Sequence, residues 1–160
     1  MKQSFKKHNE LILSFSPYDI FKETDCRPFI WSHFIRHNLL LHERFNESLE
    51  LGEDQEFIIR YMCNSKRVFF TSRILYTHYN NHNSSYNRIS MDPNKMCKNH
   101  ITMVKSILST VAIDSEEYRT WVFNTLYDPF VHSDRNPEDA KAIRQIFQSM
   151  DISTFPIDHL

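Results

Sequence analysis

Two adjacent carboxylates, Glu53 and Asp54, follow the only glycine of this 160-residue chain, Gly52. Glycine adopts positive φ values and allows close backbone approaches that other residues avoid. An apolar helical pattern starts at Phe57 and Ile58, so Asp54 would lie in the first turn of a helix. Free N–H groups and the helix dipole favour an ionised carboxylate at that position. The pattern therefore predicts a charged carboxylate beside an unusual backbone, and ordinary helix capping is the alternative.

A second group that could do chemistry is the histidine pair His33 and His37. Four residues apart on one helix, they would have a usable spacing for a metal ion. However, Phe34 stands where the H-E-x-x-H motif of zinc proteases has its glutamate, and His42 is too loosely placed to complete a site. We interpret these residues as surface histidines and predict no metal site.

The composition narrows the class of protein. With 41% hydrophobic and 24% charged residues, the chain suits one globular domain rather than a disordered segment. A net charge of −1 gives no electrostatic case for nucleic acid. The three cysteines are far apart and lack a C-x-x-C pair, and no apolar run is long enough for a membrane span, so we expect a cytoplasmic protein. Lys2, Lys6 and Lys7 could touch the inner face of an anionic membrane, with a solvated tail as the simpler alternative.

The elements that would position these residues can be predicted from apolar spacing. They are a short helix at 18–21, a helix at 30–41, a helix from 54 to about 64, β-prone runs at 67–71 and 73–79, a polar loop at 80–90, and helices marked by 101–111, 118–126 and 143–150. Few strands thus precede many helices, and no βαβ unit carries a glycine-rich phosphate turn. The predicted fold class is α+β, mainly helical with a small sheet. We divide the chain into a leader with a short helix (1–27), a central segment (28–90) and a helical extension (91–160) that forms one compact unit with it.

Four ordered blocks are spread along the central segment, between about residues 28 and 88. They are PFIWSHFIR (28–36), RFNE (44–47), LGEDQEF (51–57), and VFF (68–70) with ILYTHY (74–79) and SS (84–85). This set resembles the second half of a bacterial family 2 glycosyltransferase, which shows a tryptophan and a basic-aromatic helix, an "r-F-d/n-E" loop, "G-E-D" with a later phenylalanine, and an "l-Y-x-Y-R-x-H-x-x-S" segment.

The resemblance implies the C-terminal part of a GT-A α/β fold, and transfer of a sugar from a nucleotide-sugar donor to an acceptor hydroxyl with inversion. It implies that Asp54 is the catalytic base and that Glu53 orients the acceptor or the loop. Gly52 would let the loop approach the sugar. The remaining contacts with acceptor or diphosphate are assigned to Trp31, His78, His82 and Arg88. Without the resemblance, the two histidines and the serine pair would be interpreted as surface and loop residues.

The sequence departs from the family in two places. It has no D-x-D motif to hold Mg²⁺ or Mn²⁺ on a donor diphosphate, and Asn80 replaces the basic residue common after the second tyrosine. We therefore expect only the acceptor-side half, as a truncated gene product or an excised fragment. The chain itself would bind no cofactor, and the cation would belong to the missing donor half.

The resulting hypothesis is a partial glycosyltransferase of cell-surface polysaccharide synthesis, inactive alone. Its partners would be a nucleotide-sugar donor and a carbohydrate or lipid-linked acceptor. We also expect a homodimer that covers an apolar face made of Phe29, Ile30, Trp31 and 68–70. Two alternatives stay open: a non-catalytic helical interaction module derived from such an enzyme, and a free-standing helical binding protein in which G-E-D only caps a helix.

Overall fold

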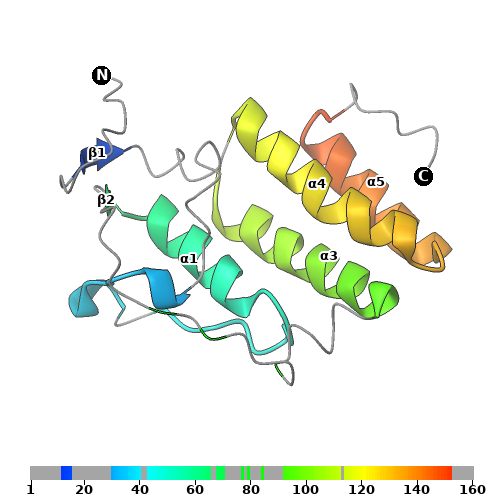
Figure 1. The fold of residues 1–160 in the computed structure, drawn as a ribbon. Coiled ribbons are helices and arrows are strands. Elements are labelled where there is room, and N and C mark those ends of the chain that lie inside the picture. The colour runs from blue at the N-terminus through cyan, green and yellow to red at the C-terminus, as the bar shows by residue number, and fades with distance from the viewer. Residues whose placement is uncertain are drawn as a thin grey trace.

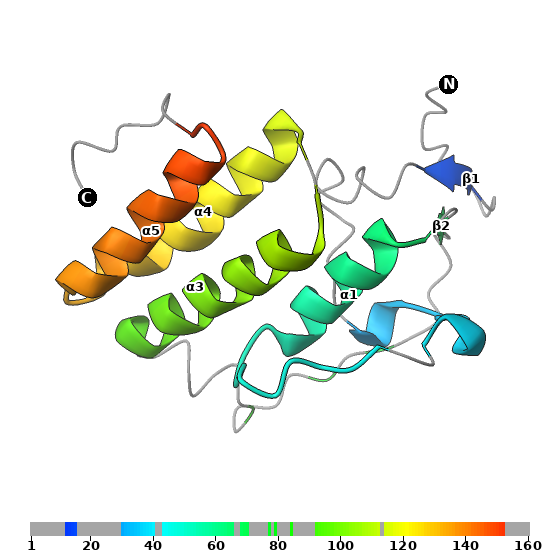
Figure 2. The same ribbon diagram turned by 180° about the vertical axis from the view of Figure 1, so that it is seen from behind.

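The fold is known from a computed structural model that describes residues 12–15, 30–40, 43–65, 68–70, 77, 79, 84, 92–112 and 114–152. In chain order the elements are β1 (Ile12–Phe15), the 3₁₀ turns η2 (Ile30–Ser32) and η3 (His37–Leu39), α1 (Glu53–Cys63), β2 (Val68–Phe70), α3 (Pro93–Thr110), α4 (Glu116–His132) and α5 (Pro137–Ser149). Helix α3 is central, because it contacts α1 on one side and both α4 and α5 on the other (Figures 1 and 2).

The three C-terminal helices begin where side chains satisfy their first free N–H groups. Asp92 accepts a hydrogen bond from the Lys95 N–H at 3.1 Å at the start of α3. Ser115 does the same for Tyr118 at 3.1 Å in α4. Asn136 accepts the N–H of Glu138 at 2.8 Å just before Pro137 opens α5. Such caps are each worth about 1 kcal/mol, and the last two of them begin the helices predicted from the apolar residues at 118–126 and 143–150.

The buried side chains form two clusters. The larger one joins α3, α4 and α5, and its fully buried members include Val104, Ile107, Tyr118, Val122 and Phe147. The smaller one consists of Phe57, Ile58 and Met62 on α1, against which Ile30, Ile35, Leu40 and Tyr61 pack. The segment of residues 30–40 is therefore held to α1 by apolar contacts.

The predicted α+β fold class, and with it the C-terminal part of a GT-A fold, is wrong for the described residues. Their core is all-helical. The strand pairing in this part of the chain is limited to an antiparallel β1–β2 ribbon, in which Val68–Phe70 pairs with Ile12–Phe15 in the leader rather than with the run 73–79. Of that run the structure describes only Thr77 and Tyr79, neither of them in a strand. Among the described residues, the helices bury their apolar stripes against each other, and strand propensity depends on such context.

The predicted helix at 30–41 is also wrong. The segment forms η2 and η3, each closed by one short-range backbone bond, and residues 33–36 between them have no regular secondary structure. A helix would place Trp31, Phe34 and Ile35 along one stripe. Instead Ile30, Ile35 and Leu40, spaced five residues apart, reach the cluster on α1, and two 3₁₀ turns joined by an irregular link satisfy that spacing. The predicted short helix at 18–21 lies outside the described residues.

Candidate functional site

Gly52 sets the entry into α1. It is the residue before the helix and has φ 84° and ψ 8°, the left-handed conformation that glycine adopts without strain. A Cβ atom at this position would lie 2.9 Å from the Sδ atom of Met103 on α3. The prediction of an unusual backbone at Gly52 is therefore confirmed, and the same residue allows the loop to pack closely against α3.

Asp54 lies in the first turn of α1, as the sequence predicted, and its carboxylate is partly buried. Its Oδ1 atom accepts the N–H of Gln55 at 2.8 Å. Burial raises the pKa of the Asp54 carboxyl above its ordinary value of 3.8; backbone hydrogen bonds with Gln55, Ile30 and Asp54 itself, and the charge of His33, offset this rise only in part. A carboxylate that is harder to keep ionised is a stronger proton acceptor.

The segment from η2 onward brings a second part of the sequence to this carboxylate. Helix α1 contacts η2, and Ile30 and His33 both act on Asp54. Trp31, between them, is 38% exposed. Glu53 is the first residue of α1 and is partly exposed. In the structure, the block at 28–36 thus lies beside the block at 51–57, although about twenty residues separate Ile30 and His33 from Asp54 in the chain.

The other predicted contacts, His78, His82 and Arg88, lie outside the described residues, as does His42. His37 is in η3 and exposed, whereas His33 lies in the irregular link before it, so the two do not share a helix face. Within the described part of the chain, no group of three or more histidine, cysteine, aspartate or glutamate side chains could hold a metal ion.

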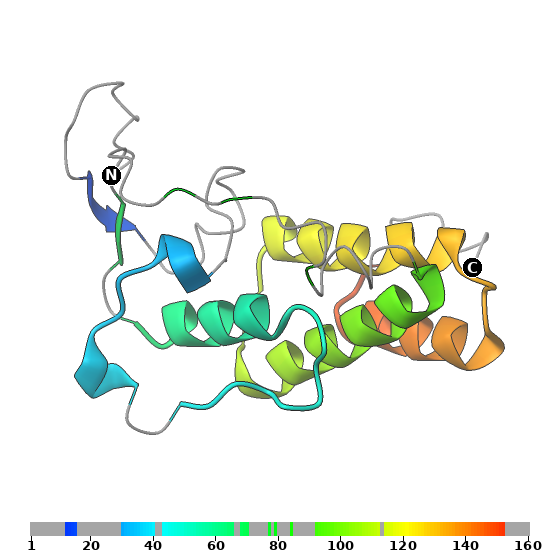
Figure 3. The ribbon, with the colours of Figure 1, turned by 60° about the horizontal axis from the view of Figure 1, so that its bottom comes forward.

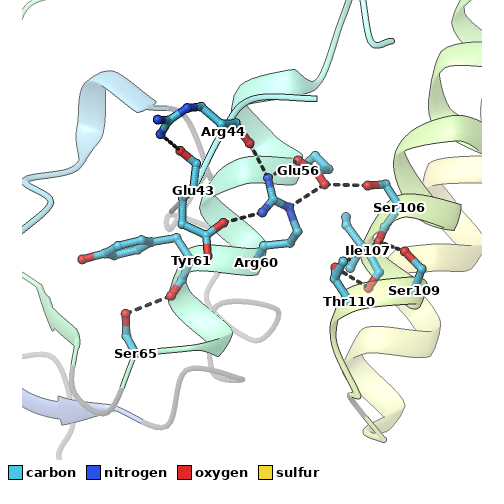
Figure 4. A network of polar contacts seen from close by, with 10 residues as sticks. All are labelled: Glu43, Arg44, Glu56, Arg60, Tyr61, Ser65, Ser106, Ile107, Ser109 and Thr110. Atoms are coloured by element: carbon cyan, nitrogen blue, oxygen red, sulfur yellow. Dashed lines mark hydrogen bonds and ion pairs between the residues drawn. The ribbon is translucent and has the colours of Figure 1, made fainter. Parts of the chain in front are cut away.

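A partly buried charge network, which the sequence analysis does not predict, supports the loop that carries Gly52 (Figure 4). The Oε1 atom of Glu56 accepts hydrogen bonds from Arg60 Nε at 2.6 Å and from Ser106 Oγ at 2.7 Å. Arg60 also donates to the carboxylate of Glu43 and, at 2.7 Å, to the carbonyl oxygen of Arg44. One guanidinium therefore ties the start of the 43–52 loop to α1, and Glu56 ties α1 to α3.

The charges in this network compensate one another. Burial works to lower the pKa of the Arg60 guanidinium, but hydrogen bonds and charges from Glu56 and Glu43 outweigh it and raise that pKa. A buried carboxylate such as Glu56 is costly unless it is paired and hydrogen-bonded. The E-x-x-x-R spacing of Glu56 and Arg60 is the sequence signal that could have revealed the pair, since residues four apart meet on a helix. Nothing in the sequence indicates Ser106 as the third member.

A second set of contacts holds the end of the same loop. The N–H of Glu50 donates to Asn99 Oδ1 at 3.1 Å, and Asn99 Nδ2 donates to the Lys95 carbonyl oxygen at 2.9 Å. The Lys95 ammonium also pairs with the Glu50 carboxylate. Helix α3 therefore fixes the loop immediately before Gly52, and the position of Asp54 depends on two separate polar anchors.

Comparison with known proteins leaves the family of the chain open. No family model matches the sequence, and neither a curated protein nor a solved structure is found to be similar to it. None of the helices that the structure describes combines the length and the apolar character needed to cross a bilayer.

Proposed function

We propose that this chain supplies the acceptor side of a glycosyltransferase acting in cell-surface polysaccharide synthesis on the cytoplasmic side of the membrane. The observation that carries the proposal is the partly buried Asp54 carboxylate, placed directly after left-handed Gly52 and beside the segment of Ile30 and His33. These residues come from two of the four blocks that resemble family 2 glycosyltransferases. Two independent anchors, through Arg60 and Asn99, keep this loop in place.

In the proposed reaction Asp54 is the general base. It takes the proton of the acceptor hydroxyl while that oxygen forms a bond with the anomeric carbon of the donor sugar. The bond from this carbon to the diphosphate breaks, and the nucleoside diphosphate leaves with the electron pair. Attack from the face opposite the leaving group inverts the configuration, so base and diphosphate lie on opposite sides of the sugar. The raised pKa of Asp54 suits a group that must accept a proton.

The donor would be bound elsewhere. The sequence has no D-x-D motif, so we propose that groups outside these 160 residues hold the diphosphate and its Mg²⁺ or Mn²⁺, and that the chain alone is inactive. Titration of the chain with UDP- or GDP-sugars and either cation should give no saturable heat. A micromolar isotherm would contradict this part of the proposal.

The second candidate is a non-catalytic helical interaction module. It is favoured by the closed core of α3, α4 and α5, in which Tyr118, Val122 and Phe147 are fully buried without a partner chain. In that case Asp54 would only complete the first turn of α1.

Acceptor binding separates the two candidates. Saturation-transfer NMR on the chain, with a panel of mono- and oligosaccharides, should detect binding that Asp54→Asn weakens. The matched control is Asp139→Asn, because Asp139 also lies in the first turn of a helix, α5, on another part of the structure. Failure of the unmodified chain to bind any sugar, or equal weakening by both variants, would favour the interaction module.

A further inference from the structure

Helix α4 contains a proline, Pro129, close to its C-terminal end at His132. A proline inside a helix has no N–H to donate to the carbonyl oxygen four residues earlier, and its ring crowds that same carbonyl. In α4 this carbonyl belongs to Thr125. Pro129 is buried and Thr125 is partly buried, so a carbonyl group left without a donor at this place would be costly.

His100 on α3 supplies the missing donor. Its Nδ1 atom lies 2.8 Å from the carbonyl oxygen of Thr125. A carbonyl oxygen can only accept a hydrogen bond, so in the neutral ring Nδ1 carries the proton and Nε2 is bare. The two helices lie side by side (Figures 1 and 3). The bond therefore joins α3 to α4 at the point where Pro129 interrupts the hydrogen bonding of α4.

The surroundings of His100 favour the neutral ring. Burial lowers the pKa of the imidazole below its ordinary value of 6.5, and the bond to Thr125 and the charge of Asp128 oppose this effect only in part. Asp128 lies on α4 and is exposed; among the described residues of α1, α3, α4 and α5, it is the charged group that acts on His100. Protonation would place a positive charge between two packed helices, where it is poorly hydrated.

We propose that the His100–Thr125 bond makes the contact between α3 and α4 sensitive to protons. Pro129 leaves a gap in the hydrogen bonding of α4, and the neutral imidazole of His100 closes it from α3. Protonation of the bare Nε2 atom then weakens the contact between the two helices. This property is independent of Asp54 and goes beyond the acceptor-side function.

Urea denaturation at about pH 7.5 and about pH 5 tests the proton sensitivity. A group with a lowered folded-state pKa stabilises the fold fully above pH 6.5, and that contribution is lost as the pH falls through the folded pKa. His100→Asn keeps an N–H donor at the place of Nδ1 but takes up no proton. We expect this variant to retain most of the stability at the higher pH and to lose less of it in acid than the unmodified chain does.

The matched control is His132→Asn. The Nδ1 atom of His132 also bonds a carbonyl oxygen of α4, that of Asp128 at 2.8 Å, but its ring is exposed. A protonated histidine in the last turn of a helix is favoured by the helix dipole. The control should therefore leave the loss of stability in acid at least as large as in the unmodified chain.

A double-mutant cycle tests the link to Pro129. While Pro129 is present, His100→Ala leaves the Thr125 carbonyl without a donor and should raise the ratio of unfolded to folded chain about tenfold. Pro129→Ala provides a new N–H at position 129, which can bond that carbonyl within α4. In this background His100→Ala should raise the ratio only about two- to threefold.

NMR of the unmodified chain provides a measure that does not depend on the stability of any variant. The ring of His100 should titrate with a midpoint below 6.5, and a long-range ¹H–¹⁵N spectrum of its neutral form should show the proton on Nδ1. The proposal is overturned by a midpoint at or above 6.5 or by a proton on Nε2 instead. It is also overturned if His100→Ala has equal effects in the two backgrounds, or if His100→Asn leaves the loss in acid unchanged.

Discussion

The buried carboxylate of Glu56 receives two hydrogen bonds from the guanidinium of Arg60, one turn further along α1, at 2.6 Å from Nε and 3.1 Å from Nη2. Only 1% of Glu56 is exposed, whereas its partner reaches outward to the loop at Glu43 and Arg44. The pair thus connects the helix interior with the chain that leads to Gly52. Each end of the pair depends on the other, because either charge alone would be poorly compensated.

Removal of one partner should therefore be costly. We expect Arg60→Met to lower the free energy of unfolding by about 3–5 kcal/mol, because Glu56 would stay buried without its cation. Urea denaturation measures the change. The matched control is Arg119→Met, since Arg119 pairs with the exposed Asp114, and a surface pair is worth only about 0–1 kcal/mol. Equal losses in the two variants would mean that the Glu56–Arg60 pair contributes no more than a surface contact.

Gly52 should resist replacement for two separate reasons. Gly52→Ala forces a side chain into φ 84° and places its Cβ 2.9 Å from Met103 Sδ, so we expect a loss of about 1–3 kcal/mol of stability. The double variant with Met103→Ala removes the close contact but leaves the backbone strain. If Gly52→Ala were as stable as the unmodified chain, neither the left-handed backbone nor the contact with α3 would constrain this position.

The helices that could be predicted from the sequence are those in which a capping residue stands a few positions before a regular apolar stripe. The Ser115 cap of α4 and the Asn136-Pro137 start of α5 are short patterns, and each precedes a regular apolar stripe. The segment of Ile30 and Ile35 is different, because the spacing of its apolar residues is typical of a helix that the structure does not form. Its actual shape is set by α1, a distant element that the local pattern does not contain.

The candidate site was predictable to the same extent. Gly52 and Asp54 stand together in the sequence, so their relationship could be predicted from local rules. The direction of the Asp54 pKa shift could not, because it comes from burial of the carboxyl group in the fold, which outweighs the opposite effects of Ile30 and His33. Likewise, the bond of Ser106 to Glu56 joins residues fifty positions apart and follows from the packing of α3 on α1.

The raised pKa of Asp54 has a consequence for stability. A folded-state pKa above the unfolded value of 3.8 favours the protonated folded form, so this group's contribution is full below pH 3.8 and is lost as pH rises through the folded pKa. Asp54→Asn removes this dependence while retaining an oxygen that can accept the Gln55 N–H. We therefore expect the stability of the variant, relative to that of the unmodified chain, to increase as the pH rises above 3.8.

Urea denaturation at several pH values measures that gain, and Asp139→Asn is the control from the first turn of α5. A variant less stable than the unmodified chain at pH 7 would show that the ionised Asp54 carboxylate stabilises the helix as a cap. A gain in stability would mean that the ionised Asp54 carboxylate destabilises the fold, as is common for groups retained for function.

The last prediction concerns the reaction itself. When the chain is combined with a donor-binding segment, Asp54→Asn should lower sugar transfer by roughly 10²–10⁴-fold, the usual contribution of a general base. Donor affinity should barely change, because the proposed base acts on the acceptor side of the sugar. Transfer rates and donor titrations on the same preparations measure the two quantities separately, and Asp139→Asn should leave both unchanged. If Asp54→Asn retained near-full turnover, Asp54 would be a first-turn helix residue without a catalytic role, and the interaction module would become the better account of this chain.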